Sequence, residues 1–295
     1  QVWHVFEEYQ KLMEEKQLRD VDTAMYECRK ILENTNEGSR YASIIVDEGQ
    51  DLSMNAYRLL RALAGAERSN DIFFVGDAHQ RIYKKRAVLS RCGINIRGRS
   101  SYLRINYRTT EEIRKFAFGL LKGVTFDDLN GGFDAGEACH SLTHGKAPQV
   151  EIFKNAAEEF DFILTKLKQL MEHGVDLRNV CIVARTHRLL DDYIAQLNNA
   201  GIKTYEIRRS KLDERSFDGV RVATMHRVKG LEFEHVFVVA VNKCVVPLAA
   251  AIGYTDPVTE EEAITAEKCL LYVALTRAQK SAYITGYGSP SEFLA

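Results

Sequence analysis

The sequence predicts an α/β fold in which parallel sheets are covered by helices. In both halves of the chain, short runs of β-branched and aromatic residues alternate with segments of helical periodicity, an order that is typical of parallel sheets. A loop-like section rich in Gly and Asp, residues 127–146, separates the two halves. With 295 residues, the chain is long enough for two ordinary domains. We therefore expect two α/β domains.

The first half opens with two predicted helices. Over residues 1–34, apolar residues recur at helical spacing, and Asp20 or Asp22 is placed to cap the second helix. The elements expected after these helices are a strand at 43–47, a helix at 54–65, a strand at 71–77 and a helix at 109–123. This order predicts a parallel sheet with helical connections.

The second half continues the alternation. Strands are expected at 149–153, 179–184, 203–207, 220–224, 235–241 and 281–286. Two helices carry a one-sided apolar face, formed by Phe160, Ile163, Leu164, Leu167 and Leu170 in the first and by Leu190, Tyr193, Ile194 and Leu197 in the second. A third helix is expected near 260–278. One-sided apolar faces of this kind predict helices that pack on a sheet.

The charge and the cysteines limit the class of protein. The chain has 40 Lys and Arg against 41 Asp and Glu, a formal net charge of −1, so nucleic-acid binding would have to come from a local patch. The six cysteines are scattered without a Cys-x-x-Cys pair, which disfavours a zinc site and a disulfide framework and is typical of a reducing compartment. No apolar run approaches the roughly 20 residues of a membrane span. We expect a cytoplasmic protein that does not bind membranes.

Carboxylates stand at the ends of the first two predicted strands. Asp47 and Glu48 follow the first strand, and Asp77 ends the second. Because ligands of parallel α/β sheets bind beyond the carboxyl ends of the strands, we expect these groups to face one crevice. An aspartate there can hold Mg²⁺, and an adjacent glutamate can orient or deprotonate an attacking water. The alternative is a solvated turn in which Asp51 caps the next helix, and this segment alone does not decide between the two.

Four further segments bear on this choice when they are taken in order. They are GDAHQRIY (76–83), LRINYRTT (103–110), VRVATMHRVKGLEFEHVFVV (220–239) and LLYVALTRA (270–278). Together with IIVDEGQD (44–51), these segments resemble motifs II to VI of the UvrD/Rep-type superfamily 1 DNA helicases. The resemblance covers nearly the whole chain.

The resemblance implies a specific architecture. It implies two RecA-like parallel-sheet domains of the P-loop NTPase type, with ATP and Mg²⁺ bound between them. Residues 1–103 would form a partial first domain with its preceding helices, incomplete at its N-terminus. Residues 104–295 would form the second domain, without the large helical insert of bigger family members.

The resemblance also implies residue roles. The implied catalytic residues are Glu48 as the base, Gln80 as the sensor of the γ-phosphate, and Arg108 and Arg277 as arginine fingers. The implied nucleotide contacts are Tyr107 on the adenine, Gly230, Glu232, and Asp47 through Mg²⁺. The implied contacts to single-stranded DNA are Thr224, His226 and Lys85. Taken singly, each residue has an ordinary alternative: an arginine near a helix end is commonly a solvated charge, and Tyr107 can pack in a core.

Two features depart from the family pattern. No segment reads Gly-x-x-x-x-Gly-Lys-Ser/Thr, the loop that wraps the phosphates of ATP. In the family this loop lies upstream, so we expect the chain to be the C-terminal part of a longer helicase and to be inactive alone. Lys85 stands where the family usually has an aromatic that stacks on a DNA base, and a lysine offers chiefly a salt-sensitive phosphate contact.

The leading prediction is part of an ATP-dependent DNA helicase or translocase that moves on single-stranded DNA, with a 3′-to-5′ direction implied by the resemblance alone. The expected partners are single-stranded or duplex DNA and repair or replication proteins, and the expected state is a monomer. One rival is a catalytically silent helicase-like scaffold that binds DNA or a protein. A second rival is a metal-dependent nuclease built on Asp47, Glu48 and Asp77, although the sequence lacks the additional ligands that such a site requires.

Overall fold

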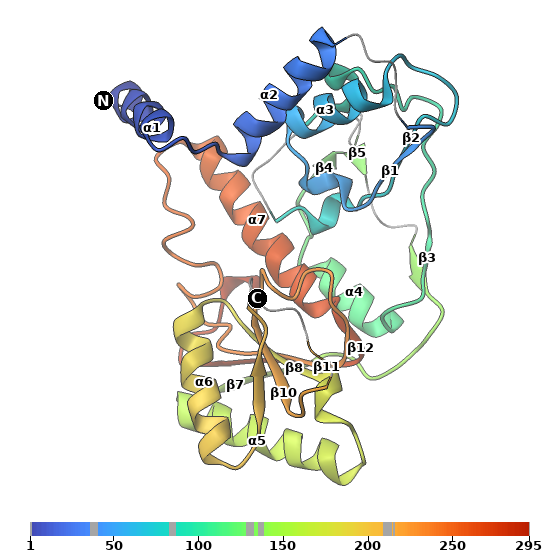
Figure 1. Ribbon diagram of the computed structural model, residues 1–295. Helices are drawn as coiled ribbons and strands as arrows, with labels where there is room; N and C mark the ends of the chain where they lie inside the picture. Colours follow the sequence, from blue (N-terminus) through green and yellow to red (C-terminus); the bar gives the residue numbers. More distant parts are fainter. Residues whose placement is uncertain are drawn as a thin grey trace. The chain divides into compact units, whose positions relative to one another are not determined.

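A computed structural model describes residues 2–35, 41–82, 87–127, 133–134, 139–208, 214 and 216–294 (Figure 1). The chain divides into two compact units, which are treated separately below. Unit 1 comprises Gln1–Ala78, Lys85–Ser101 and Asp127–Asp134, and unit 2 comprises His79–Lys84, Tyr102–Phe126 and Ala135–Ala295. Both units combine helices with parallel strand pairs, so the predicted α/β class with parallel sheets is confirmed. No helix among the described residues is long and apolar enough to cross a membrane.

Unit 1 begins with the two predicted helices. Its elements are α1 (Val2–Glu15), α2 (Val21–Asn34), β1 (Ile44–Val46), the 3₁₀ turn η1 (Gly49–Asp51), α3 (Met54–Ala64), β2 (Ile72–Phe74) and the 3₁₀ turn η3 (Leu89–Cys92). Asp20 caps α2, because its side chain accepts a hydrogen bond from the backbone N–H of Thr23. The strands β1 and β2 pair in parallel, with Ile44 opposite Ile72. Both strands are shorter than the sequence predicted.

The residue that caps α3 is not Asp51, the cap that the sequence analysis gave as an alternative. Asp51 is the last residue of η1, and Ser53 is the N-cap of α3, where its side chain accepts from the backbone N–H of Ala56. The proposed Asp51 cap is therefore wrong. Ser53 satisfies the same requirement two residues later, since either side-chain type can accept from a free N–H of the first turn.

The core of unit 1 is small. Tyr57 of α3 packs against a buried cluster formed by Ala87, Leu89, Cys92 and Ile94. On the β1–β2 pair, Ile45 is 77% exposed and Phe73 is 62% exposed. Within the described residues, this small sheet therefore has apolar side chains on an uncovered face.

Unit 2 is built on a six-stranded sheet in the order β7-β12-β11-β8-β10-β9, in which every neighbouring pair is parallel. The strands are β7 (Gln149–Phe153), β8 (Val180–Ala184), β9 (Thr204–Glu206), β10 (Val220–Thr224), β11 (Phe233–Val238) and β12 (Ala278–Tyr287). All six follow the sequence prediction to within a few residues. Every residue of β8 and β10 is buried, as expected for central parallel strands that are covered on both faces.

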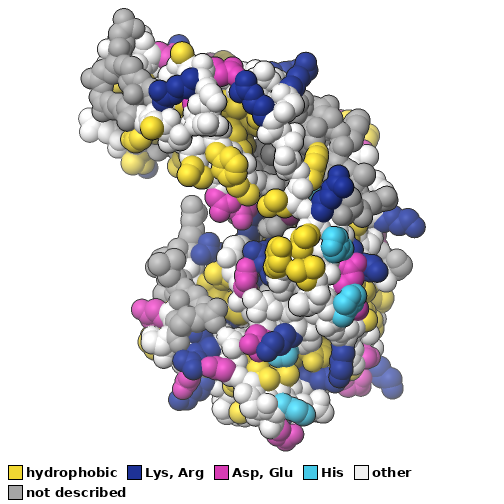
Figure 2. All heavy atoms as spheres, turned by 90° about the vertical axis from the view of Figure 1, so that its right-hand side faces the viewer, with side chains coloured by type: hydrophobic (Ala, Val, Ile, Leu, Met, Phe, Trp, Pro, Cys, Tyr) yellow, Lys and Arg dark blue, Asp and Glu magenta, His cyan; other side chains and the backbone are white. Residues whose placement is uncertain are grey.

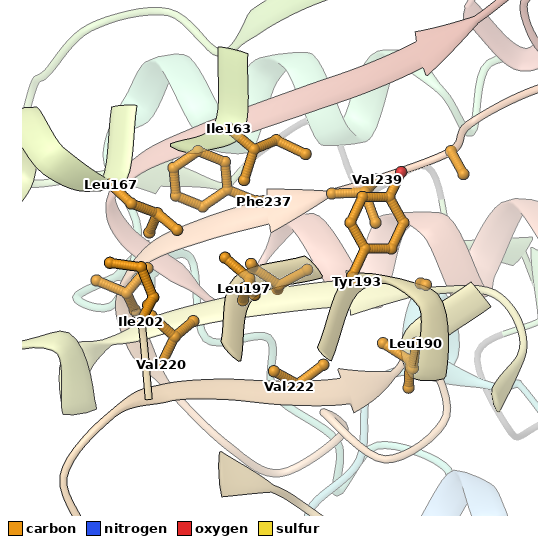
Figure 3. Close-up of a cluster of buried hydrophobic side chains, with 14 residues drawn as sticks. Ile163, Leu167, Leu190, Tyr193, Leu197, Ile202, Val220, Val222, Phe237 and Val239 are labelled. Atoms are coloured by element: carbon orange, nitrogen blue, oxygen red, sulfur yellow. The ribbon is translucent and has the colours of Figure 1, made fainter. Parts of the chain in front are cut away.

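Helices cover this sheet. They are α4 (Glu111–Gly119), α5 (Ala156–Glu172), α6 (His187–Asn199) and α7 (Pro257–Leu275). Figure 3 shows Ile163 and Leu167 of α5, together with Leu197 of α6, packed over the apolar residues of β10 and β11. On α7, the buried residues include Leu270 and Leu271, and this helix packs against β11 and β12. Helix α7 begins and ends three residues before the predicted 260–278.

The predicted loop 127–146 is more ordered at its end than expected. His140–Ser141 forms β6, which pairs in parallel with β3 (Ile105–Asn106). Glu111 of α4 accepts a hydrogen bond from the backbone N–H of Ser141 at 2.8 Å. Helix α4 itself is shorter than the predicted 109–123, because Thr110 caps it and it ends at Gly119. The remaining two-residue strands are β4 (Phe126–Asp127) and β5 (Phe133–Asp134), which pair with each other.

Candidate functional site

The acidic turn of unit 1 has a strained backbone at the predicted base. Glu48 follows β1 in the left-handed region, with φ at 51°, a conformation that is uncommon for any residue other than glycine. The Asp47 carboxylate accepts the backbone N–H of Glu48 at 2.8 Å. Backbone strain of this type clusters at active sites, ligand clamps and switch regions. Asp47 and Glu48 thus follow the carboxyl end of β1 directly, and the backbone of Glu48 is held in one conformation.

Gln50 joins the ends of the two strands, and the sequence analysis did not single it out. It is 2% exposed, its Nε2 donates to the Glu48 carboxylate, and its Oε1 accepts the backbone N–H of Asp77 at 3.0 Å. A Cβ at Gly76 would lie 2.9 Å from Gln50 Oε1, so this position has no room for a larger residue. That the carboxylates of Glu48 and Asp77 face one crevice stays a prediction, and Gln50 links the Glu48 carboxylate to the backbone of Asp77. The signal for it was the amide two residues after Glu48 in IIVDEGQD.

The described residues contain no group of three or more His, Cys, Asp or Glu side chains that could hold a metal ion by themselves. The carboxylate of Asp47, which the sequence assigned to Mg²⁺, lies on an exposed residue. Such a carboxylate suits the way Mg²⁺ is usually bound beside a nucleotide, because one or two protein carboxylates then suffice while water and phosphate oxygens supply the other ligands.

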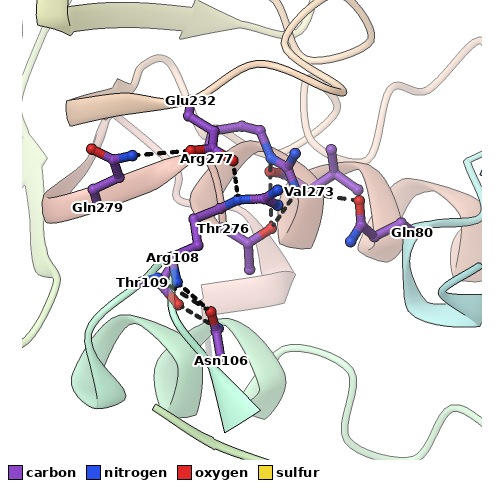
Figure 4. A network of polar contacts seen from close by, with 9 residues as sticks. All are labelled: Gln80, Asn106, Arg108, Thr109, Glu232, Val273, Thr276, Arg277 and Gln279. Carbon is purple, nitrogen blue, oxygen red and sulfur yellow. Dashed lines mark hydrogen bonds and ion pairs between the residues drawn. The ribbon is translucent and has the colours of Figure 1, made fainter. Parts of the chain in front are cut away.

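In unit 2, one set of predicted residues meets at the amino edge of the sheet (Figure 4). Glu232 immediately precedes β11, and Arg277 immediately precedes β12. Arg108, which follows β3, donates from Nε to Glu232 Oε1 at 2.6 Å. The other Glu232 oxygen accepts Gln279 Nε2 at 3.0 Å. An ion pair between residues 124 positions apart in the sequence thus brings the β3–α4 connection to the edge of the main sheet.

Arg277 is enclosed rather than solvated. Its residue is 1% exposed, and its Nε donates to the backbone carbonyl of Val273 at 3.1 Å. Its Nη2 donates to Gln80 Oε1 at 3.2 Å and to Thr276 Oγ1 at 3.3 Å. The ordinary alternative for this arginine, a solvated charge at a helix end, is therefore wrong. Figure 4 shows the guanidinium directed toward Gln80, so two residues with predicted phosphate roles touch each other.

Two other predicted residues, Gly230 and Tyr107, also belong to unit 2. The backbone carbonyl of Gln80 accepts the Nζ of Lys229 at 2.8 Å, a contact that the sequence analysis missed. Gly230, the next residue, has φ at 81°, which glycine adopts without strain. Tyr107 is 74% exposed, so the alternative in which it packs in a core is wrong.

A second set lies at the opposite edge of the same sheet. Thr224 is the last residue of β10, His226 follows it, and Arg185 immediately follows β8. Arg185 forms a two-pronged ion pair with Glu267 of α7, with Nε to Oε2 at 2.9 Å and Nη2 to Oε1 at 2.6 Å. Burial lowers the pKa of His226, the positive charge of Arg185 lowers it further, and Glu267 opposes the shift. The imidazole therefore lies close to a buried ion pair that the sequence analysis did not predict.

The remaining predicted DNA contact, Lys85, lies outside the described residues. On the face that Figure 2 shows, charged side chains of both signs are interspersed, which agrees with the net charge of −1. Contact with an anionic ligand must therefore rely on local groups such as Arg108, Arg277, His226 and Arg185.

The predicted site residues of unit 2 fall into two sets at opposite edges of its main sheet. Because all strands of the sheet run parallel, their amino ends share one edge and their carboxyl ends share the other. The amino edge gathers Glu232, Arg277 and, through contacts, Arg108 and Gln80. The carboxyl edge carries Thr224 and His226. Guanidinium groups at the first edge can stabilise negative charge that develops in a phosphoryl transfer.

Comparison with known proteins identifies relatives of both parts of the chain. The profile of the UvrD-like helicase C-terminal domain matches residues 101–216 and 196–289. The profile of the UvrD/REP helicase N-terminal domain matches residues 1–89.

Individual proteins and one solved structure are also similar to parts of this chain. A Mycoplasma pneumoniae protein named "Probable DNA helicase" is 26% identical over 280 residues, which are 90% of this chain and 48% of that protein. The ATP-dependent DNA helicase PcrA of Staphylococcus epidermidis is 41% identical over 68 residues, 23% of this chain and 9% of PcrA. A solved C-terminal domain of a possible DNA helicase from Lactobacillus strain WCFS1 has a TM-score of 0.45 and 20% identity, covering 64% of this chain and 92% of that domain.

This chain thus spans about half the length of the Mycoplasma relative. The C-terminal-domain profile alone matches more than half of the chain, from residue 101 to residue 289. The ordered series of motifs and the profile matches lead to the same conclusion, that the chain belongs to the UvrD-like helicase family.

Proposed function

We propose that the full-length protein is an ATP-dependent DNA helicase or translocase that couples ATP hydrolysis to movement on single-stranded DNA. The observation that supports this most is the network at the amino edge of unit 2. There, Arg108 contacts Glu232 and Gln80 contacts Arg277, although the four residues are spread over nearly 200 positions, from 80 to 277. The family resemblance implies a role in nucleotide chemistry for these same residues.

Arg277 and Arg108 are the proposed arginine fingers. Bound ATP, as its Mg²⁺ complex, supplies the phosphoryl group that is transferred to water. Arg277 is suited to neutralise charge on that group, because its guanidinium is buried and is held by three acceptors at hydrogen-bond distance. Arg108 is about equally exposed as its partner Glu232, with side-chain exposures of 38% and 41%, so their ion pair can exchange for a phosphate contact at little cost. Gln80 positions the Arg277 guanidinium and is the proposed γ-phosphate sensor.

Glu48 is the proposed general base and Asp47 the proposed Mg²⁺ ligand. The left-handed backbone of Glu48 and its contact with Gln50 hold the carboxylate in one direction, as a base that accepts a proton from an oriented water requires. Gln50 is the proposed positioning residue for Glu48. Tyr107 offers an exposed ring for stacking on a base, and Gly230 leaves backbone space beside Glu232.

Thr224 and His226 are the proposed contacts to single-stranded DNA. Their place at the carboxyl edge of the sheet, away from the residues at the amino edge, supports separate sites for nucleotide and DNA within unit 2. Lys85 stays a prediction. The division into two RecA-like domains at residue 103, the supply of a phosphate-binding loop by chain outside residues 1–295, the monomeric state and the repair or replication partners also stay predictions.

The second candidate is a helicase-like scaffold without catalysis. The two candidates differ in what Glu48→Gln does to ATP hydrolysis by the full-length protein. We expect hydrolysis that is stimulated by single-stranded DNA, and we expect Glu48→Gln to lower kcat by about 100-fold or more, since a positioned general base contributes on that order. The matched control is Glu67→Gln in the same unit, where the carboxylate faces Arg99. A wild-type protein without DNA-stimulated hydrolysis, or a Glu48→Gln variant with full activity, contradicts the proposal.

A further inference from the structure

A buried ion pair holds α7 to the carboxyl edge of the sheet. The side chains of Arg185 and Glu267 are 10% and 6% exposed, and both oxygens of Glu267 accept from the guanidinium. Glu267 Oε2 also accepts the backbone N–H of Leu248 at 3.0 Å. One carboxylate on α7 thus fixes the residue after β8 and the turn that follows β11. Two-pronged arginine–carboxylate pairs restrict orientation as well as distance.

Helix α7 connects the two edges of the sheet. Glu267 lies about two helical turns before the carboxyl end of α7, and Arg277 follows that end by two residues. The ion pair meets the sheet where β8 ends, whereas Arg277 stands where β12 begins. A single packed helix therefore has the carboxyl-edge ion pair on its middle and the amino-edge guanidinium just beyond its end.

The ion pair also faces the predicted DNA contact. His226 experiences the charges of both Arg185 and Glu267, so a displacement of Arg185 changes the surroundings of the imidazole. The strand pairing accounts for this proximity. Strands β8 and β10 are adjacent, and Thr224 pairs with Ala184, the residue directly before Arg185.

We infer that the Arg185–Glu267 pair is a coupling device: it fixes α7 to the carboxyl edge, so that DNA bound beside His226 changes the position of Arg277 at the nucleotide. Glu267 is thus a positioning residue, which contacts neither ligand. The inference rests on the proposed function, because it needs a nucleotide at one edge and DNA at the other. Coupling between two sites is reciprocal, so the nucleotide must change the affinity for DNA by the same factor as DNA changes the affinity for the nucleotide.

Simple stabilisation is the competing account of the same pair. Removal of one partner of a buried ion pair leaves an uncompensated charge, whereas replacement of both partners leaves no such charge. The neutral double variant Arg185→Gln/Glu267→Gln therefore separates the two accounts. A purely stabilising pair predicts that a folded double variant couples normally, and a coupling device predicts that it does not.

The first experiment measures coupling without catalysis. The affinity of the full-length protein for a fluorescent single-stranded oligonucleotide is determined by anisotropy, with and without a non-hydrolysable ATP analogue. We expect the wild type to show a ratio of affinities of about 5-fold or more. In Glu267→Gln and in the double variant, the ratio falls to within about 2-fold of unity. The matched control is Glu260→Gln on the same helix, whose carboxylate accepts two backbone N–H groups, and it keeps the wild-type ratio.

The second experiment reports on the ion pair itself. The pKa of His226 is followed by NMR, with the resonance assigned through His226→Gln. Because Glu267 raises this pKa and Arg185 lowers it, Glu267→Gln lowers it and Arg185→Gln raises it. Opposite shifts confirm that the pair acts on the imidazole in solution, and unchanged values contradict the inference.

The outcomes distinguish the inference from the proposed function. A wild type that binds DNA but shows no effect of the ATP analogue contradicts the inference, and a wild type that also lacks DNA-stimulated hydrolysis contradicts the proposed function. Coupling in the wild type that persists in Glu267→Gln overturns the inference and leaves the function standing. If Glu267→Gln does not fold, the neutral double variant gives the same reading, and normal coupling in that variant overturns the inference.

Discussion

The six-stranded sheet of unit 2 and the β1–β2 pair of unit 1 differ sharply in how well they are covered. In unit 2, every residue of the central strands β8 and β10 is buried. In unit 1, the β1–β2 pair has Ile45 and Phe73 largely exposed, and the core cluster among the described residues of this unit contains five buried side chains. Burial of apolar surface is the main stabilising term in folding, and a two-stranded sheet is marginal without packing on both faces.

The proposed catalytic residues of the two units therefore differ in how well the surrounding structure fixes their positions. Arg277 and Glu232 stand directly before strands of the well-covered sheet, so their positions are fixed by the core of unit 2. Glu48 stands after β1, where local contacts with Gln50 and Asp47 carry most of the support. We therefore expect substitutions in unit 2 to alter stability more than equivalent substitutions in unit 1.

The largest expected effect comes from truncation of a buried isoleucine. Ile182→Ala in β8 removes a fully buried side chain and is expected to destabilise unit 2 by about 3–4 kcal/mol, because it leaves a cavity among well-packed neighbours. Ile45→Ala in β1 removes an exposed side chain and is expected to change the stability of unit 1 by less than about 1 kcal/mol. Native-state hydrogen exchange of the β8 and β1 amides measures the two units separately. Equal effects at the two positions would contradict the comparison.

Removal of a buried hydroxyl should have a smaller effect with the same asymmetry. In unit 2, Tyr193 donates to the carboxylate of Glu159, a fully buried residue whose other oxygen accepts the backbone N–H of Ala240 at 2.9 Å. In unit 1, Tyr57 donates to the carbonyl of Gly49. Tyr193→Phe is expected to cost about 2–3 kcal/mol, because a buried charge loses a donor, and Tyr57→Phe about 1 kcal/mol.

These two variants are compared by native-state hydrogen exchange in urea, with amides of each unit followed separately. Burial and the nearby Glu159 charge also raise the pKa of Tyr193 far above its ordinary value, so the phenol stays protonated and remains a donor at neutral and alkaline pH. A larger loss from Tyr57→Phe than from Tyr193→Phe would show that the local contacts of unit 1 matter more than its small core indicates.

The last expected effect, at a buried carboxylate of unit 2, depends on pH. Hydrogen bonds from Arg114 lower the pKa of Glu111 to about 2, and the backbone N–H of Ser141 contributes in the same direction. A carboxyl whose pKa is lower in the folded state stabilises the protein above its unfolded pKa, and this contribution is lost as the pH falls toward the folded value. Glu111→Gln should therefore cost about 1.5 kcal/mol at pH 7, and the difference from wild type should shrink between about pH 4.5 and pH 2.

Urea unfolding of the wild type and of Glu111→Gln at pH 7, 4.5 and 3 checks this sign. The control is Glu8→Gln on the exposed surface of α1, which should follow the wild type throughout. A difference between wild type and Glu111→Gln that grows on acidification would show that the Arg114 contact does not stabilise the ionised form.

Most of the main sheet could be predicted from the sequence, because its strands and helices are long enough to show their periodicity. The β3–β6 pair could not, since two-residue strands show no alternation. The capping residue of α3 was uncertain for a local reason: Asp51 and Ser53 are both good N-caps, and only the start of the helix distinguishes them.

The sequence predicted the site residues that lie in recognisable motifs. It did not predict pairs formed by residues that are far apart in the sequence. Arg108, Glu232 and Arg277 lie in recognisable segments, and the structure brings Arg108 and Glu232 into contact. The Arg185–Glu267 pair joins residues 82 positions apart, and neither residue is distinguished by its neighbours in the sequence. Gln50 was visible in the acidic stretch, but its role depends on the position of the Asp77 backbone, which only the pairing of β1 with β2 supplies.

We propose that Glu48 of unit 1 and Arg277 of unit 2 act on the same ATP hydrolysis step. A double-mutant cycle in the full-length protein tests this directly, with kcat for DNA-stimulated hydrolysis measured for wild type, Glu48→Gln, Arg277→Lys and the double variant. Residues that act together on one transition state give losses that do not multiply. We predict that each single variant loses about 100-fold or more in kcat and that the double variant is within about 10-fold of the weaker single variant. A double variant whose loss equals the product of the two single losses, or an Arg277→Lys variant with full kcat, would contradict the account.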